Sequence, residues 1–195
     1  MKITTCFSII VFLLLSGFCI AAPLGEFKPG SEPDGFRGIK WGSDLSKLPE
    51  MIPDAKWDAF KAYTRSGDNL EFDSVKLTNI RYITWQGRFY KVVLKTDKGL
   101  EDYYALINAI RERFGTEART QTSESNEGGK GFQLCINGYK TTLTIYHTPA
   151  QDDGRVAYGA VSIASTEILN EIYPGLSEIV KKWKILQSKK DASVQ

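Results

Sequence analysis

The chain has 195 residues, of which 42% are hydrophobic and 25% are charged, a mixture typical of a globular protein and not of a disordered one. Its formal net charge of +2 provides no strong electrostatic field toward nucleic acid, so we expect no nucleic-acid partner. The length suits one domain with a substantial hydrophobic core.

The N-terminus has the parts of a secretory signal peptide, which we assign to residues 1–21. Lys2 gives a positive start, and residues 9–15 are an uninterrupted apolar run. Cleavage after Ala21 is preferred to cleavage one residue later, because the second cut would break the bond before Pro23. We therefore expect a periplasmic or secreted protein.

Two alternatives for this segment stay open. A retained transmembrane helix needs about 20 apolar residues, whereas this run is shorter and is broken by Ser16 and Gly17. A lipoprotein would carry its lipid on Cys19, but the bulky Phe18 stands where a small residue is expected.

The rest of the chain divides into a leader, one domain and a tail. Residues 22–35 contain several prolines and glycines with little apolar periodicity, and predict an extended leader. Residues 36–187 carry the periodic patterns of a single α+β domain, and residues 188–195 form a frayed tail.

The first half of the domain predicts one short helix and then three strands and a helix. Ser43 is the expected N-cap of the short helix, which runs from Asp44 to about Met51 and is stopped by Pro53. The expected strands and the long helix cover residues 57–65, 75–85, 88–95 and 97–114, with a two-residue turn at Gln86-Gly87. The aromatic spacing in 57–65 also fits a helix, which stays the alternative for that segment.

The second half repeats the order of strands and helix after a loop at residues 116–131. We expect strands at 132–136, 139–147 and 155–164, followed by a helix that Thr166 caps. Asn137-Gly138 predicts a type I′ turn in which Gly138 has a positive φ. A last amphipathic helix over 177–187 has these apolar residues on one side: Ile179, Val180, Trp183 and Leu186.

Together these elements predict an α+β fold. Its antiparallel sheet is built from two successive strand-strand-strand-helix units, with a short N-terminal helix and a C-terminal helix. The patterns leave open whether the two halves form one sheet or two facing lobes.

The most distinctive segment spans residues 35–43 and contains Gly38-Ile39-Lys40-Trp41-Gly42. It resembles the opening of uncharacterised bacterial exported α+β proteins that carry such a Gly-Ile-Lys-Trp-Gly phrase. The resemblance covers about ten residues, and it implies an exported α+β fold without an assigned activity. Core packing of the segment is the favoured interpretation, and Arg37, Lys40 and Trp41 are the candidate binding residues if the segment instead recognises a ligand.

No group of residues predicts a reaction. Cys135 is the only cysteine outside the signal peptide and is expected to be a small buried hydrophobe, with a catalytic pairing to His147 as the alternative. The sequence contains no nucleotide, phosphate or metal motif, so we expect no catalytic residue, metal or cofactor. Five aromatic residues are candidates for a ligand floor, although packing against a covering helix is the favoured interpretation: Trp57, Tyr82, Trp85, Tyr90 and Tyr146.

The sequence thus favours an exported, non-catalytic binding or interaction module whose partner is a protein or a small ligand of the cell envelope. A small carboxylate-based hydrolase and a structural envelope accessory protein are the alternatives. Membrane contact is not expected, and the oligomeric state is left open.

The signal peptide leads to a direct prediction. Protein isolated from its native host should begin at Ala22, because the peptidase removes the segment before it. N-terminal sequencing and intact mass measure this. A cytoplasmic chain that still begins at Met1 would contradict export, and a lipid on Cys19 would replace soluble release by anchoring.

Overall fold

The computed structural model describes residues 27–96, 100–114, 121–124, 130–138, 140–148 and 158–175. The expected signal peptide, the helix over 177–187 and the tail lie outside the described residues.

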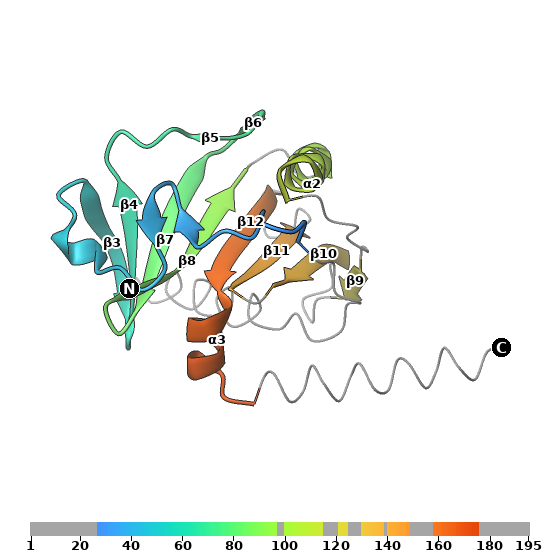
Figure 1. Ribbon diagram of the computed structural model, residues 1–195. Coiled ribbons are helices and arrows are strands. Elements are labelled where there is room, and N and C mark those ends of the chain that lie inside the picture. Colours follow the sequence, from blue (N-terminus) through green and yellow to red (C-terminus); the bar gives the residue numbers. More distant parts are fainter. Residues whose placement is uncertain are drawn as a thin grey trace, which may run out of the picture.

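Eight strands form one antiparallel sheet in the order β3-β4-β7-β8-β12-β11-β10-β9 (Figure 1). The strands are β3 (Met51–Trp57), β4 (Phe60–Arg65), β7 (Asn79–Trp85), β8 (Arg88–Lys95), β9 (Gln121–Glu124), β10 (Lys130–Asn137), β11 (Thr141–Thr148) and β12 (Tyr158–Ser165). The prediction of an α+β fold with an antiparallel sheet is confirmed. Strands from both halves of the chain share this one sheet, because β8 pairs with β12.

Two helices lie on opposite faces of the sheet. On what we call the first face, α2 (Leu100–Phe114) buries Leu106 and Ile110. On the second face, α3 (Thr166–Ile172) buries Ile168 next to Ile83 and Tyr90. Side chains alternate between the faces along each strand, as the pleat requires.

The short helix expected from Asp44 to about Met51 is wrong in length. Only one 3-10 turn forms, η1 (Leu45–Lys47), and its N-cap is Asp44, whose carboxylate accepts from the Ser46 N–H at 3.1 Å. Met51 instead starts β3, which continues through Pro53 with a bulge before Ala55. Proline is tolerated there because β3 is an edge strand, where an N–H on the free side has no ladder partner.

Four further predictions need correction. The strand expected at 57–65 begins only at Phe60, because the chain turns back there from β3 into β4. The N-cap of α3 is Ser165 and not Thr166, since the Ser165 hydroxyl accepts from the Ile168 N–H at 3.3 Å. The strand expected at 75–85 is divided, since β6 (Val75–Lys76) pairs with β5 (Glu71–Phe72) in a separate small sheet and β7 begins at Asn79. The loop expected at 116–131 contains β9. Four strands of the large sheet therefore precede each helix, instead of three.

Residues 27–43 form a strap across the first face, shown in blue in Figure 1. The Lys28 N–H donates to the Phe114 carbonyl at the end of α2, at 2.9 Å. At the other end of the strap, the Gly42 N–H donates to the Phe89 carbonyl at 2.7 Å. Between them a small hairpin, β1 (Gly35–Phe36) and β2 (Ile39–Lys40), buries Phe36 and Ile39. The described part of the expected leader is thus held against the domain.

The two turn predictions have different outcomes. At Gln86-Gly87 both residues have positive φ, 50° and 81°, which confirms the two-residue turn. At the other hairpin, Asn137 pairs with Thr142, so four residues connect the ladder positions and the predicted type I′ turn is wrong.

Gly138 is required for a different reason from the predicted one. It is not among the glycines with positive φ. A Cβ there would lie 2.6 Å from the Glu32 carboxyl carbon and 2.8 Å from the Phe27 ring. The Glu32 carboxylate occupies this space because it accepts hydrogen bonds from the N–H groups of Lys140 and Thr141.

We predict that Gly138→Ala lowers the free energy of unfolding by about 1–3 kcal/mol, because the added methyl overpacks against the strap. Urea denaturation measures the change. In a Glu32→Ala background the same substitution should cost less. Equal costs in the two backgrounds would show that Glu32 is not the obstacle.

Candidate functional site

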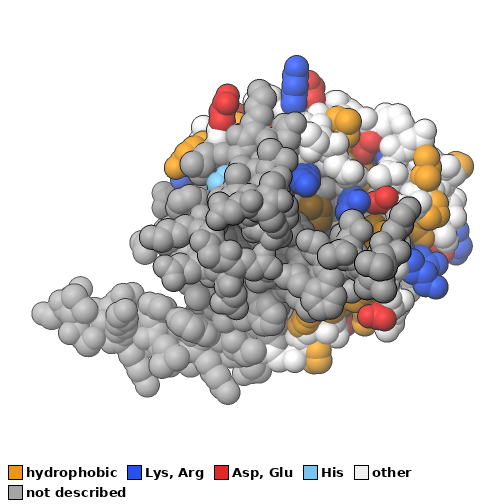
Figure 2. Space-filling view, turned by 180° about the vertical axis from the view of Figure 1, so that it is seen from behind, with side chains coloured by type: hydrophobic (Ala, Val, Ile, Leu, Met, Phe, Trp, Pro, Cys, Tyr) orange, Lys and Arg blue, Asp and Glu red, His pale blue; other side chains and the backbone are white. Residues whose placement is uncertain are grey.

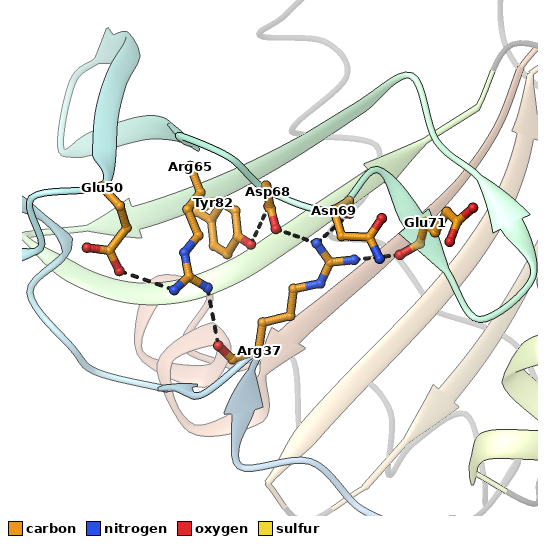
Figure 3. Close-up of polar contacts among 7 residues, drawn as sticks. All are labelled: Arg37, Glu50, Arg65, Asp68, Asn69, Glu71 and Tyr82. Atoms are coloured by element: carbon orange, nitrogen blue, oxygen red, sulfur yellow. Dashed lines mark hydrogen bonds and ion pairs between the residues drawn. The ribbon is translucent and has the colours of Figure 1, made fainter.

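Arg37 lies at the turn of the β1–β2 hairpin, and its guanidinium points toward the loop that contains Asp68, Asn69 and Glu71 (Figure 3). It forms an ion pair with Asp68 and donates to the backbone carbonyls of Asn69 and Glu71. Arg37 has a φ of 49° and the following Gly38 a φ of 81°, and this tight turn starts the return of the chain into β2. The guanidinium thus fastens the strap to the loop that follows β4.

Tyr82 completes this contact from the sheet. Its hydroxyl donates to the Asp68 carboxylate at 2.6 Å, and the Asp68 side chain is only 8% exposed. Burial of Tyr82, together with its hydrogen bond to Asp68 and the charge of that carboxylate, raises the pKa of the phenol far above its usual range. The hydroxyl therefore stays protonated and remains a donor.

A second arginine extends these contacts. Arg65 donates to the Glu50 carboxylate at 3.2 Å and to the Arg37 carbonyl at 3.4 Å. Asp68 already accepts from two donors in a nearly closed space, so its carboxylate is occupied by structural contacts. We call Arg37, Asp68 and Tyr82 the strap anchor.

The other two candidate residues do not converge with Arg37. Trp41 donates its indole N–H to Thr141 Oγ1 at 3.1 Å, and its ring packs on Phe89 with centroids 4.9 Å apart. Lys40 is exposed. Arg37 and Trp41 are therefore engaged in internal contacts, and Lys40 alone of the three faces solvent.

A row of aromatic side chains crosses the second face at one end of the sheet. Trp57 of β3 lies opposite Phe60 of β4, which lies opposite Trp85 of β7. The Trp57 and Phe60 rings are nearly parallel, with an interplanar angle of 14° and centroids 6.0 Å apart. All three side chains are half-buried, and we call them the aromatic shelf. In the view from behind, hydrophobic side chains are visible on the side of the molecule that carries β3 and β4 (Figure 2).

The structure brings together part of the expected aromatic floor. Trp57, Trp85 and Tyr90 are in one cluster with Phe60. Tyr82 belongs to the first-face core, and Tyr146 lies on β11, away from the shelf. Phe60 was not among the expected floor residues. It lies opposite Trp57 because only the two residues 58 and 59 separate β3 from β4.

Charged groups border the shelf on the side of α3. The Arg88 guanidinium lies over the Trp85 ring, 5.2 Å from the centroid, and binds both oxygens of Glu171. Leu169 and Ile172 of α3 pack against the same cluster. The hydrogen bond from Arg88 lowers the pKa of the Glu171 carboxyl, so that this border carries a guanidinium and a carboxylate at neutral pH.

The β10–β11 register argues against a Cys135–His147 pair. Cys135 pairs with Thr144 and Phe132 pairs with His147, so positions 135 and 147 alternate to opposite faces of the sheet. His147 is buried, and burial lowers its pKa. Cys135 lies in a strand as expected, but its side chain is outside the described residues.

Lys91 is a buried amine that was not among the candidate residues. It lies on β8 between Ile83 and Ala164, and burial lowers its pKa to about 8. The signal in the sequence is one lysine inside a continuous apolar strand.

Within the described ranges, no group of three His, Cys, Asp or Glu residues could hold a metal ion. The same part of the chain contains no helix long and apolar enough to cross a membrane. Comparison of the chain with protein-family models, curated proteins and solved structures finds no match.

We predict that Arg37→Ala lowers the free energy of unfolding by about 3 kcal/mol, since it leaves the Asp68 carboxylate buried without its cation. Lys40→Ala, a change at an exposed position three residues away, should stay within about 0.5 kcal/mol of the unchanged protein. Thermal and urea melts compare the two variants. Similar small effects would show that the strap anchor does not stabilise the fold.

Proposed function

We propose that the protein is an exported, non-catalytic binding or interaction module of the cell envelope and that the aromatic shelf contacts its ligand. The observation that carries the proposal is the half-exposed row of Trp57, Phe60 and Trp85 across three strands. Large aromatic side chains supply much of the binding energy in protein interfaces when a partner removes them from water.

The position of the shelf supports a role beyond packing. Other aromatic side chains of the sheet, such as Tyr82 and Phe89, are fully buried beneath the strap. The shelf lies next to the β3 edge, where Ile52 also leaves about half of its side chain exposed, at 52%. A partner could therefore reach the shelf from the open edge of the sheet.

The carboxylate that borders the shelf favours binding over hydrolysis. Glu171 forms an ion pair with Arg88, whose hydrogen bond lowers the pKa of the Glu171 carboxyl. A hydrolase would need one carboxyl group that keeps its proton near neutral pH, and a neighbouring arginine has the opposite effect on a carboxyl pKa. The hydrolase and the structural accessory protein remain the alternatives that an experiment must separate.

The test uses the mature protein, immobilised and exposed to an envelope extract of its native host. Trp57→Ala should lower recovery of the specifically captured molecule by about 30-fold, corresponding to about 2 kcal/mol for an aromatic anchor. Tyr104→Ala is the matched control, because Tyr104 is 60% exposed on α2, on the opposite face. Circular dichroism checks that both variants are folded.

Capture that is identical for the unchanged protein and Trp57→Ala would contradict the shelf as the binding surface. Turnover of a captured molecule would favour the hydrolase. Equal loss in Trp57→Ala and Tyr104→Ala would also count against the shelf, because the effect would then not be specific to its face.

A further inference from the structure

The Asn137-Gly138 pair at the end of β10 is a chemically reactive peptide as well as part of a turn, and it is the only Asn-Gly pair in the chain. In such a pair the glycine nitrogen can attack the side-chain carbonyl carbon of the asparagine, because glycine has no side chain to hinder the approach. A carbon–nitrogen bond forms, ammonia leaves, and a five-membered succinimide results. Water then opens this ring and gives aspartate or isoaspartate.

Two conditions must be met before the Gly138 nitrogen can react. The nitrogen must lose its proton, and the main chain must leave the extended conformation so that the nitrogen approaches the side-chain carbon. In the structure Asn137 is the last residue of β10 and pairs with Thr142 of β11, which keeps it extended. The Gly138 N–H donates to the Thr141 carbonyl at 2.8 Å. Neither condition is therefore met while the hairpin is closed.

The strap adds a second barrier at the same peptide. The Glu32 carboxylate lies against Gly138, since a Cβ there would be 2.6 Å from its carboxyl carbon. The carboxylate also accepts from the N–H groups of Lys140 and Thr141, and so holds the turn in one conformation. Its negative charge opposes loss of the proton from the Gly138 nitrogen, because two like charges close together are unfavourable.

Release of the strap would remove this barrier as a unit. Thr141, the first residue of β11, donates its hydroxyl to the Pro33 carbonyl at 2.5 Å and accepts from the Trp41 indole at 3.1 Å. Glu32, Pro33 and Trp41 therefore all dock on the residue that also binds the Gly138 N–H. Loss of these contacts leaves the Gly138 peptide freer to rotate.

We propose that Asn137-Gly138 is a site of spontaneous deamidation and that the docked strap keeps it closed. While Glu32 stays on the turn, the Gly138 nitrogen keeps its proton and its hydrogen bond. When the strap is released, this nitrogen attacks Asn137, with water as the other reactant and ammonia as the leaving group. The site therefore converts a transient opening of the strap into a permanent chemical change. This inference does not rest on the proposed function of the aromatic shelf.

The product of the reaction acts back on the strap. Aspartate and isoaspartate each add a negative charge at position 137, next to the glycine that Glu32 contacts. Repulsion between the two carboxylates weakens the docking of the strap. Isoaspartate also adds one main-chain atom at the end of β10, which disturbs the pairing of position 137 with Thr142. A modified chain thus holds its strap less firmly than an unmodified one.

The test incubates the mature protein at mildly alkaline pH, which favours loss of the amide proton, and measures aspartate and isoaspartate at position 137 by peptide mass spectrometry. The folded protein should react at least about tenfold more slowly than the same protein unfolded in urea, because only locally opened molecules react. Glu32→Ala should raise the rate in the folded protein by about tenfold, since it removes two hydrogen bonds to a charged acceptor. Equal rates in the folded and unfolded protein would overturn the proposal.

Two further variants show whether the effect belongs to Glu32. Glu32→Gln keeps an acceptor oxygen but loses the charge, so its rate should lie between those of the unchanged protein and Glu32→Ala. Lys40→Ala, a change at an exposed position elsewhere on the strap, is the matched control and should react like the unchanged protein. Urea denaturation checks that each variant is folded during the incubation. Reaction of Glu32→Ala at the rate of the unchanged protein, or equal acceleration in Lys40→Ala, would overturn control by the strap.

The effect of the product on the strap is measured separately. Asn137→Asp carries the aspartate product from the start, and Asn137→Ser is its uncharged control. The Thr141 N–H, which donates to Glu32, should exchange with deuterium roughly threefold faster in Asn137→Asp than in Asn137→Ser, because the strap is held less firmly. Equal exchange in the two variants would overturn the proposed action of the product on the strap.

Discussion

The antiparallel pairing of β8 with β12 is the contact on which the rest of the fold depends. Its register, from Ala160 opposite Lys95 to Ala164 opposite Lys91, joins the two halves of the chain in one sheet. The helices add to this dependence: α2, from the first half, packs on β11 and β12, and α3 packs on these two strands and on side chains of β7 and β8. Each helix therefore relies on strands of the other half, so loss of the β8–β12 pairing would disturb both cores.

Elements whose cause is local could be predicted from the sequence, and those whose cause is distant could not. The Gln86-Gly87 hairpin and the apolar period of α2 depend on neighbouring residues, and both are present. In the sequence, Pro53 resembles a residue that ends a helix. It is tolerated in β3 because that strand lies at the edge of the sheet, which is a property of the whole sheet and not of the local sequence. Gly138 is needed because a carboxylate from residue 32 occupies the space beside it, a contact that no local pattern contains.

The candidate site likewise combines features that the local sequence predicts with features that depend on distant residues. Arg37 and Trp41 belong to a distinctive local phrase, but their partners are Asp68 and Thr141, which lie 31 and 100 residues away in the sequence. The aromatic floor was partly predictable, because Tyr82 and Trp85 are three residues apart on one strand and must face opposite sides of a sheet. That alternation by itself separates Tyr82 from the floor. Lys91 stands out in the sequence as a charge within an apolar strand. Its burial, however, depends on the parts of the fold that cover β8, and these cannot be read from the strand itself.

The strap also constrains when the fold can be completed. Its first described residue follows the expected cleavage site closely, and its Glu32 carboxylate must find the Thr141 N–H, 109 residues later. The contact between Glu32 and β11 therefore cannot form until the second half of the chain is in place. Because contacts this distant in sequence form slowly compared with local ones, the strap closes late.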